Sequence, residues 1–424
     1  MRLFKFIFAG ALALSIATVS VNAFATEITS AADAGLSEKK LTSLTSHIQG
    51  YINSGRLIGA TTLVARGGKI AHLETYGHID KAAGSEMTED AIFRIHSMTK
   101  PITTAALMML WEEGKFDLND PVSKYIPSFK NQRVFSGVNE DESLKTVPVE
   151  RDATILDLMR HTSGLTYGVF GNTPVDQAYL KAGVLDPNAT LEELVDRLAN
   201  VPLLYQPGDA WVYSLSVDVQ GRLIEVLSGQ SLPAFFEERI FKPLNMVDTG
   251  FVVRPDQVDR FVELYAPDEK EKKMAPYRGP FYSDLTVMPK SPSGGGGLVS
   301  TTLDYFKFAQ MIANGGVYEG TRFLKEDTVE MMRRDHLPDN LNGIANGTQG
   351  LGFGLGFGVV IDTSKVNGKS ELGEYHWGGL ANTIFWIDPT NDVVAIFMTN
   401  ILPSGIYPLR KELRDNIYNA VGAD

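Results

Sequence analysis

The chain of 424 residues contains no cysteine. This absence excludes disulfide bonds, a cysteine nucleophile, a cysteine-ligated zinc site and an iron–sulfur cluster. It also excludes lipid attachment through a cysteine near the N-terminus. An exported protein of this size without disulfides is more typical of a bacterial periplasm or of bacterial secretion than of the small disulfide-rich scaffolds that eukaryotes secrete.

Other functional patterns are missing as well. No Gly-x-Ser-x-Gly occurs, which excludes the nucleophile elbow of an α/β-hydrolase. The seven histidines show no His-Glu-x-x-His spacing, so we predict neither a metal ion nor a cofactor. Beyond the N-terminal segment, no apolar run is long enough to predict a membrane span.

The N-terminal segment has the pattern of a secretory signal peptide. Arg2 and Lys5 form a positive start, residues 6–21 are apolar, and an Ala-x-Ala site ends at Ala25. We predict cleavage after Ala25, so that residues 1–25 are the signal peptide and the mature protein is periplasmic or secreted. The alternative is that the segment is retained as an anchor.

Positive charge is scarce in the rest of the chain. The whole sequence has 39 Lys and Arg against 51 Asp and Glu, and only Arg2 and Lys5 of these fall in the predicted signal peptide. The mature chain is therefore strongly acidic and has no basic patch. We predict no nucleic-acid partner and no binding to anionic membranes.

The periodicity of apolar residues places strands at both ends of the chain and helices between them. Strands are expected over residues 61–66, 69–76, 352–361, 374–379, 383–387 and 393–398; helices over 36–54, 155–159, 191–198, 218–227, 234–240, 302–314 and 409–421. The fold class is α/β plus all-α: an antiparallel sheet flanked by the N- and C-terminal helices, with an inserted helical domain. The expected domains are an α/β sandwich of residues 26–96 and 285–424 and a mainly helical domain of 97–284.

The strongest chemical signal is Ser97-Met98-Thr99-Lys100 at the start of an apolar helical run. Residues three apart share one face of a helix, with Cβ atoms about 5–6 Å apart, so the amine of Lys100 reaches the hydroxyl of Ser97. A serine hydroxyl is a weak nucleophile until a neighbouring base takes its proton, and Lys100 is placed to do so. The alternative is that Ser97 only caps the helix.

Two later motifs accompany this pair. Tyr213 lies on a loop just before a helix, where its phenol can project into a cleft and transfer a proton. The alternative is that Tyr213 only packs the loop. Residues 376–379, His-Trp-Gly-Gly, lie on a predicted strand, where small residues admit a substrate and an N–H can hold an oxyanion; otherwise the stretch is an aromatic strand with a bulge. We expect Asp218 to cap or anchor the helix after Tyr213, and His96 and His161 to be structural.

The order of the three motifs resembles the serine β-lactamase superfamily, and more narrowly class C β-lactamases and the family VIII carboxylesterases. Supporting stretches are residues 155–165, 243–246 and 294–300. The resemblance covers about residues 36–420, and it implies the fold expected above with the active site between the two domains. It implies that Ser97 is the acylated nucleophile, that Lys100 promotes its deprotonation, and that Tyr213 is the base or proton relay.

The resemblance also implies two oxyanion donors. The N–H of Ser97 is one. The second is the N–H of Leu380 if Trp377-Gly378-Gly379 replaces the Lys-Thr-Gly of β-lactamases, and that of Gly379 if the equivalent begins at His376. Both assignments remain open.

Two departures from the β-lactamase pattern bear on the substrate. Leu215 stands where class C enzymes carry the asparagine that binds a β-lactam side chain, and the third motif has no lysine to bind a substrate carboxylate. With His376 and Trp377 there instead, the pocket is more apolar, which favours uncharged esters.

The leading hypothesis is a carboxylesterase that cleaves small uncharged esters through a Ser97 acyl-enzyme, without metal or cofactor, or that transfers the acyl group to another acceptor. The alternative is a D-alanyl carboxypeptidase, a D-aminopeptidase or a weak β-lactamase, in which His376 would bind the carboxylate. A third hypothesis is an inactive binding protein, against which the intact set of Ser97, Lys100 and Tyr213 argues.

Overall fold

The computed structural model describes residues 28–268, 270–344 and 349–421. The predicted signal peptide lies outside these residues and stays a prediction. Within them, no helix combines the length and the apolar character that a membrane crossing needs.

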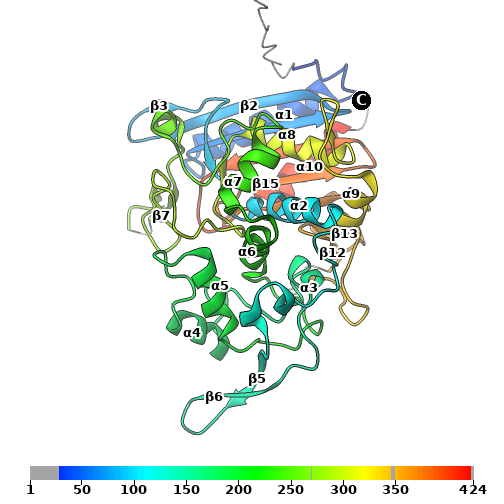
Figure 1. Cartoon of the computed structure of the whole chain (residues 1–424). Helices are drawn as coiled ribbons and strands as arrows, with labels where there is room; N and C mark the ends of the chain where they lie inside the picture. The colour runs from blue at the N-terminus through cyan, green and yellow to red at the C-terminus, as the bar shows by residue number, and fades with distance from the viewer. Residues whose placement is uncertain (1–27, 269, 345–348, 422–424) are drawn as a thin grey trace, which may run out of the picture.

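An eight-stranded antiparallel sheet is built from both ends of the chain (Figure 1). Its strands, in spatial order, are β12 (Leu351–Phe353), β13 (Gly358–Val360), β14 (Tyr375–Gly378), β15 (Ile384–Asp388), β16 (Val393–Thr399), β1 (Gly59–Arg66), β2 (Lys69–Asp80) and β3 (Ser85–Glu86). The ends meet where β1 pairs with β16, with Ala60 opposite Thr399 and Arg66 opposite Val393. The predicted antiparallel sheet made from both termini is therefore confirmed.

Both faces of the sheet are covered by helices. Alternate residues of β16 point to opposite sides: Val394 and Ile396 belong to one buried cluster, whereas Ala395 and Phe397 belong to the other. Helices α1 (Glu38–Asn53) and α10 (Leu409–Val421) cover one face, and α8 (Thr302–Ala313) covers the other (Figure 1). Each fully buried Phe or Ile contributes roughly 1.5–3 kcal/mol of stability, so these two layers hold the sheet rigid.

The region between the two halves of the sheet carries short helices. They are α3 (Ile155–Met159), α4 (Pro174–Lys181), α5 (Leu191–Ala199), α6 (Ser216–Ser228) and α7 (Leu232–Phe236). Thr154, Thr173 and Thr190 each cap one of the first three, and each forms a reciprocal capping box with an acidic residue three positions on. Such caps stabilise a helix by about 1 kcal/mol, which fixes where these short helices start.

Some elements differ from those expected. The predicted strand over 352–361 is two strands, β12 and β13, because Gly356 takes φ +87° and the chain reverses with Gly354 N–H donating to the Phe357 carbonyl. Two hairpins lie in the region expected to be helices and loops: β5 (Arg133–Val138) with β6 (Leu144–Pro148), which projects at the bottom of Figure 1, and β7 (Tyr265–Asp268) with β8 (Lys273–Pro276). The remaining strands are β4 (Phe93–Arg94), which pairs with β9 (Val299–Ser300), and the pair β10 (Val317–Tyr318) and β11 (Thr321–Arg322). Helix α9 (Glu326–Met332) follows β11.

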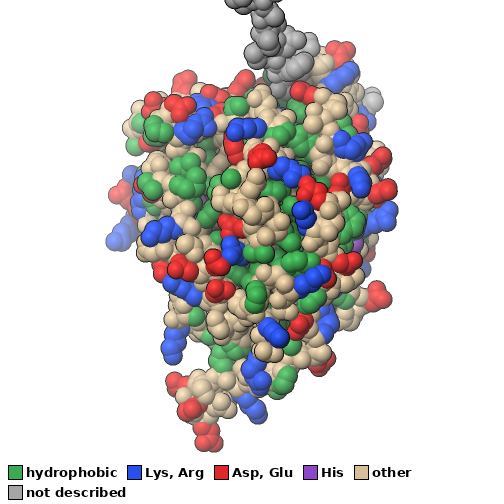
Figure 2. All heavy atoms as spheres, in the orientation of Figure 1, with side chains coloured by type: hydrophobic (Ala, Val, Ile, Leu, Met, Phe, Trp, Pro, Cys, Tyr) green, Lys and Arg blue, Asp and Glu red, His purple; other side chains and the backbone are tan. Residues whose placement is uncertain are grey.

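Acidic charge is not gathered in one patch on the face shown in Figure 2. Acidic and basic side chains are interspersed on the face shown in Figure 2. Several of them pair at the surface, such as Arg278 with Glu263 at 2.7 Å. Exposed pairs of this kind contribute at most about 1 kcal/mol each, so the fold depends mainly on its apolar clusters.

Candidate active site

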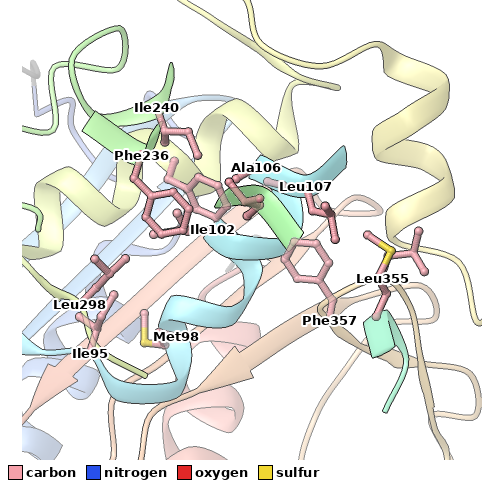
Figure 3. Packing of buried hydrophobic residues seen from close by; sticks show 14 of the residues in the cluster. Ile95, Met98, Ile102, Ala106, Leu107, Phe236, Ile240, Leu298, Leu355 and Phe357 are labelled. Carbon is pink, nitrogen blue, oxygen red and sulfur yellow. The ribbon is translucent and has the colours of Figure 1, made fainter. Parts of the chain in front are cut away.

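Ser97 lies on a helical turn that is anchored in the core. A single 3₁₀ turn, His96–Met98, runs directly into α2 (Thr99–Glu112). Figure 3 shows Met98, Ile102 and Ala106 of this segment packed among buried side chains from several elements. Because these anchors are fully buried, the position of Ser97 is fixed by packing.

The backbone around Ser97 is strained. His96 takes φ +43°, a left-handed conformation that costs a residue with a side chain about 1–2 kcal/mol. Burial, together with the nearby charges of Arg94 and Lys100, lowers the pKa of His96 to about 4, so the ring is neutral at pH 7. Such strain is typical of functional turns.

Lys100 is 1% exposed and holds its amine beside Ser97. Nζ donates to the Gly295 carbonyl at 2.5 Å, to Ser97 Oγ at 3.3 Å and to the Tyr167 hydroxyl at 3.5 Å. Among the described residues it forms no ion pair with a carboxylate. The predicted contact between Lys100 and Ser97 is thus present in the structure.

Tyr213 covers the amine with its ring. Lys100 Nζ lies 4.6 Å from the centre of the Tyr213 ring, which stacks on Tyr167 with centroids 5.4 Å apart. The hydroxyl that reaches Nζ therefore belongs to Tyr167, a residue that the sequence analysis missed. Burial, with Tyr213 and Asp218 nearby, raises the pKa of Tyr167 well above its usual value, so it remains a neutral phenol that can donate or accept a hydrogen bond.

Asp218 fixes the carbonyl that holds Lys100. Of the two expected roles, capping the helix after Tyr213 is wrong, because α6 has no side-chain cap, but Asp218 does anchor the first turn of that helix. The buried carboxylate accepts from Ser293 Oγ at 2.5 Å and from Gly295 N–H at 3.2 Å. A Cβ at Gly295 would lie 2.5 Å from Asp218 Oδ2, which explains why glycine is needed there.

The two glycines of the third motif make room for protein atoms. A Cβ on Gly379 would lie 2.2 Å from Thr383 Oγ1 and 2.5 Å from the Ile95 carbonyl, two residues before Ser97. A Cβ on Gly378 would lie 2.6 Å from Nη2 of Arg410. The pair therefore lets β14 approach the Ser97 turn and α10, in addition to any role in admitting a substrate.

The two candidate oxyanion donors on this strand differ in hydrogen bonding. Gly379 N–H donates to the Thr383 carbonyl at 2.8 Å and is occupied. Leu380, the next residue, lies outside the strand, and its N–H has no acceptor among the described residues. The first hydrogen bond of the Ser97 turn runs from Met98 N–H to the Ile95 carbonyl. The N–H of Ser97 comes before this bond, so it is one of the free donors at the start of a helix.

A cation lies beside this strand, but it is not His376. Burial lowers the pKa of His376 well below its usual value, as do Arg414 and Arg410, so its ring is neutral. Arg410, from α10, donates to the Gly379 carbonyl at 3.0 Å, and its Nε has no partner within the structure described. Burial lowers the pKa of Arg410 only to about 10, so it is charged at pH 7.

These residues border one cavity of about 360 Å³. Its lining consists of Ser97, Phe170, Tyr213, Ile344, Leu351, His376, Trp377, Gly378, Gly379, Leu380, Ser404 and Arg410. All predicted site residues line it except Lys100, which lies behind Ser97. Leu215 does not line it, because its side chain is buried in the core. The cavity thus presents a hydroxyl, with an amine behind it, and free N–H groups beside largely apolar walls, which suits acyl transfer to a serine.

The chain is similar to known proteins over most of its length. The family model described as Beta-lactamase matches residues 44–418. Protein Rv1367c of Mycobacterium tuberculosis is 34% identical over 84% of this chain and 89% of its own length, and Esterase EstB of Burkholderia gladioli is 31% identical over 86% and 91%. The structure of "EstCE1, a hydrolase with promiscuous acyltransferase activity" is similar with a TM-score of 0.74 at 26% identity, covering 90% of this chain and 99% of EstCE1.

Proposed function

The chain belongs to the β-lactamase family, and on that premise we propose that it is a serine hydrolase that cleaves carboxylic esters through an acyl-enzyme on Ser97. The observation that carries the proposal is the buried amine of Lys100, 3.3 Å from Ser97 Oγ at the edge of the cavity. The similarity to an esterase and to a hydrolase with acyltransferase activity supports this choice of chemistry.

Acylation would begin with a substrate carbonyl in front of Ser97. The Oγ attacks the carbonyl carbon while its proton passes to the amine of Lys100, 3.3 Å away. Tyr213, whose ring covers that amine, is the proposed relay that carries the proton on to the leaving alcohol. The C–O bond to the alcohol then breaks, and the alcohol oxygen leaves with the proton. In this scheme Lys100 needs no metal or cofactor to generate the nucleophile.

The tetrahedral oxyanion would be held by the N–H groups of Ser97 and Leu380. We assign the second donor to Leu380 because the N–H of Gly379 already binds Thr383. One such donor typically accelerates the reaction about 10²–10³-fold. The same two donors would serve in deacylation, when water attacks the acyl-enzyme.

An alcohol in place of water would turn hydrolysis into acyl transfer. The apolar walls of the cavity, with Phe170, Leu351 and Trp377 among them, favour an organic acceptor over water. With no lysine in the third motif and a neutral His376, we propose small uncharged esters as the main substrates.

One observation favours the alternative function. Arg410 brings a positive charge to the cavity without an ion-pair partner among the residues described, so it can bind the carboxylate of a stem peptide or β-lactam, the role that the sequence analysis gave to His376. Arg410 would then make this chain a D-alanyl carboxypeptidase or weak β-lactamase. Comparing turnover of neutral esters with that of D-alanyl-D-alanine peptides and nitrocefin separates the two.

The first test is hydrolysis of p-nitrophenyl butyrate by the mature protein and by Ser97→Ala, with a metal chelator present. We expect chelator-resistant turnover that is lost in Ser97→Ala. Turnover that survives the substitution would show that Ser97 is not the nucleophile. Absence of ester turnover together with cleavage of D-alanyl-D-alanine peptides would favour the alternative.

A further inference from the structure

A series of nearly parallel aromatic rings leads from the catalytic residues to the surface. Trp211 stacks on Tyr213 with centroids 6.2 Å apart and 18° between planes. Phe170 follows at 6.2 Å and 24° from Tyr213, and Phe281 follows at 6.1 Å and 24° from Phe170. We call these four rings the aromatic ladder. It runs beside Lys100, whose amine lies against the Tyr213 ring.

The outer rings of the ladder are unusually exposed. Trp211 is 7% exposed, whereas Phe170 is 50% and Phe281 37% exposed. Phe170 also lines the cavity that holds Ser97. Phe281 does not line the cavity itself but stacks on Phe170, so two partly exposed rings continue from the cavity lining toward solvent. Exposed apolar groups beside a cavity are where a substrate group would bury them.

Phe281 is held in place by its neighbour in the chain. The Tyr282 ring contacts two guanidinium groups: its centre lies 5.3 Å from that of Arg94 and 4.5 Å from that of Arg278. Arg278 is fixed in turn by two hydrogen bonds to Glu263, at 2.7 and 2.8 Å. Arg94 is 4% exposed and lies three residues before Ser97, so the segment that carries Phe281 is tied to the Ser97 turn.

We propose that Phe170 and Phe281 form a subsite that binds a flat aryl group of the substrate. This inference rests on the proposed esterase function and narrows its substrates to esters with an aromatic ring in the acyl or the alcohol part. A flat aryl group of the substrate would add one more ring to this stack. Its binding free energy gains from offset stacking in addition to the burial of apolar area. A cyclohexyl ring of similar size gains only from burial.

The test compares matched pairs of esters. One pair is 2-phenylethyl and 2-cyclohexylethyl butanoate, and the other is ethyl 3-phenylpropanoate and ethyl 3-cyclohexylpropanoate. We expect the protein to prefer the phenyl member of at least one pair by about two- to tenfold in kcat/KM. Phe170→Leu and Phe281→Leu keep apolar side chains without a ring, and each should bring this ratio close to one. The ratio is measured within one preparation, so partial misfolding of a variant does not affect it.

Tyr205→Leu is the matched control, because Tyr205 is a 45% exposed aromatic residue that does not line the cavity. Its ratio should equal that of the unchanged protein. A cyclohexyl preference in both pairs, or a phenyl preference that both leucine variants retain, would overturn the subsite while leaving the esterase function intact. Failure of the unchanged protein to hydrolyse any of the four esters while it hydrolyses p-nitrophenyl butyrate would overturn the subsite alone. Failure on p-nitrophenyl butyrate as well would overturn both proposals.

Discussion

Replacing Lys100 by methionine should separate catalysis from stability. Methionine keeps the apolar stem of the side chain and removes only the amine, which lies 3.3 Å from Ser97 Oγ. Loss of a positioned proton acceptor typically costs about 10²–10⁴ in rate. Each factor of ten corresponds to about 1.4 kcal/mol, so the barrier should rise by about 3–5 kcal/mol.

The expected change in stability is smaller. The Gly295 carbonyl loses its donor in Lys100→Met, at a cost of about 1–3 kcal/mol. Removal of a 1% exposed amine that has no ion pair among the described residues offsets part of this loss. The free energy of unfolding should therefore fall by less than about 2 kcal/mol.

The assays are kcat for p-nitrophenyl butyrate and urea unfolding, both at pH 7. Lys130→Met is the control, because Lys130 is exposed and should change neither quantity. If Lys100→Met kept more than about a tenth of the rate, the assignment of Lys100 as the proton acceptor would be refuted. If it unfolded at pH 7, the amine would instead have a structural role.

Three further changes have expected outcomes. Burial alone would raise the pKa of Asp157, but Arg151 and the Thr154 N–H lower it to about 2. Because this pKa is below that of an unfolded aspartate, the ionised side chain stabilises the fold above about pH 4, and the stabilisation is lost as the pH falls toward 2. Asp157→Asn should therefore lower the free energy of unfolding in urea by about 2 kcal/mol at pH 7 and by little near pH 2. Gly378→Ala should destabilise the fold by about 1–3 kcal/mol, since its Cβ would displace Arg410. In a double-mutant cycle, the variant that combines Gly378→Ala with Arg410→Met should lose less stability than the sum of the losses in the two single variants. Arg410→Met should also raise KM for a monoester with a free carboxylate more than KM for its neutral diester, a difference that vanishes if Arg410 does not face the substrate.

Much of the fold could be predicted because its signals are local. The sequence of β1 alternates toward a strand pattern and that of β16 is a continuous apolar run, each bounded by turn residues. The apolar residues of α1 and α10 recur at helical spacing. The hairpin of β12 and β13 was missed because its apolar residues read as one continuous strand, and only the positive φ of Gly356 reverses the chain. The hairpin of β5 and β6 was missed because it projects from the body and buries only Val134 fully, so its sequence shows no strict alternation of apolar and polar residues.

The site could be predicted only in part, for a similar reason. Ser97 and Lys100 are three residues apart on one turn, so their contact follows from local geometry. Tyr167 and Arg410 are far from Ser97 in the sequence, and only tertiary packing brings them to it. The charge of His376 depends on burial and on two arginines of α10, which no local pattern reveals.

The most direct test of the central claim is to find the acyl group. The chain without residues 1–25 would be mixed with p-nitrophenyl butyrate, quenched in acid within the first turnovers, digested and analysed by peptide mass spectrometry. The account predicts one butyryl group on the peptide that contains Ser97, located to that serine by fragmentation and absent from Ser97→Ala. Ester turnover with the butyryl group on another residue, or with no covalent adduct under conditions where deacylation limits the rate, would contradict it.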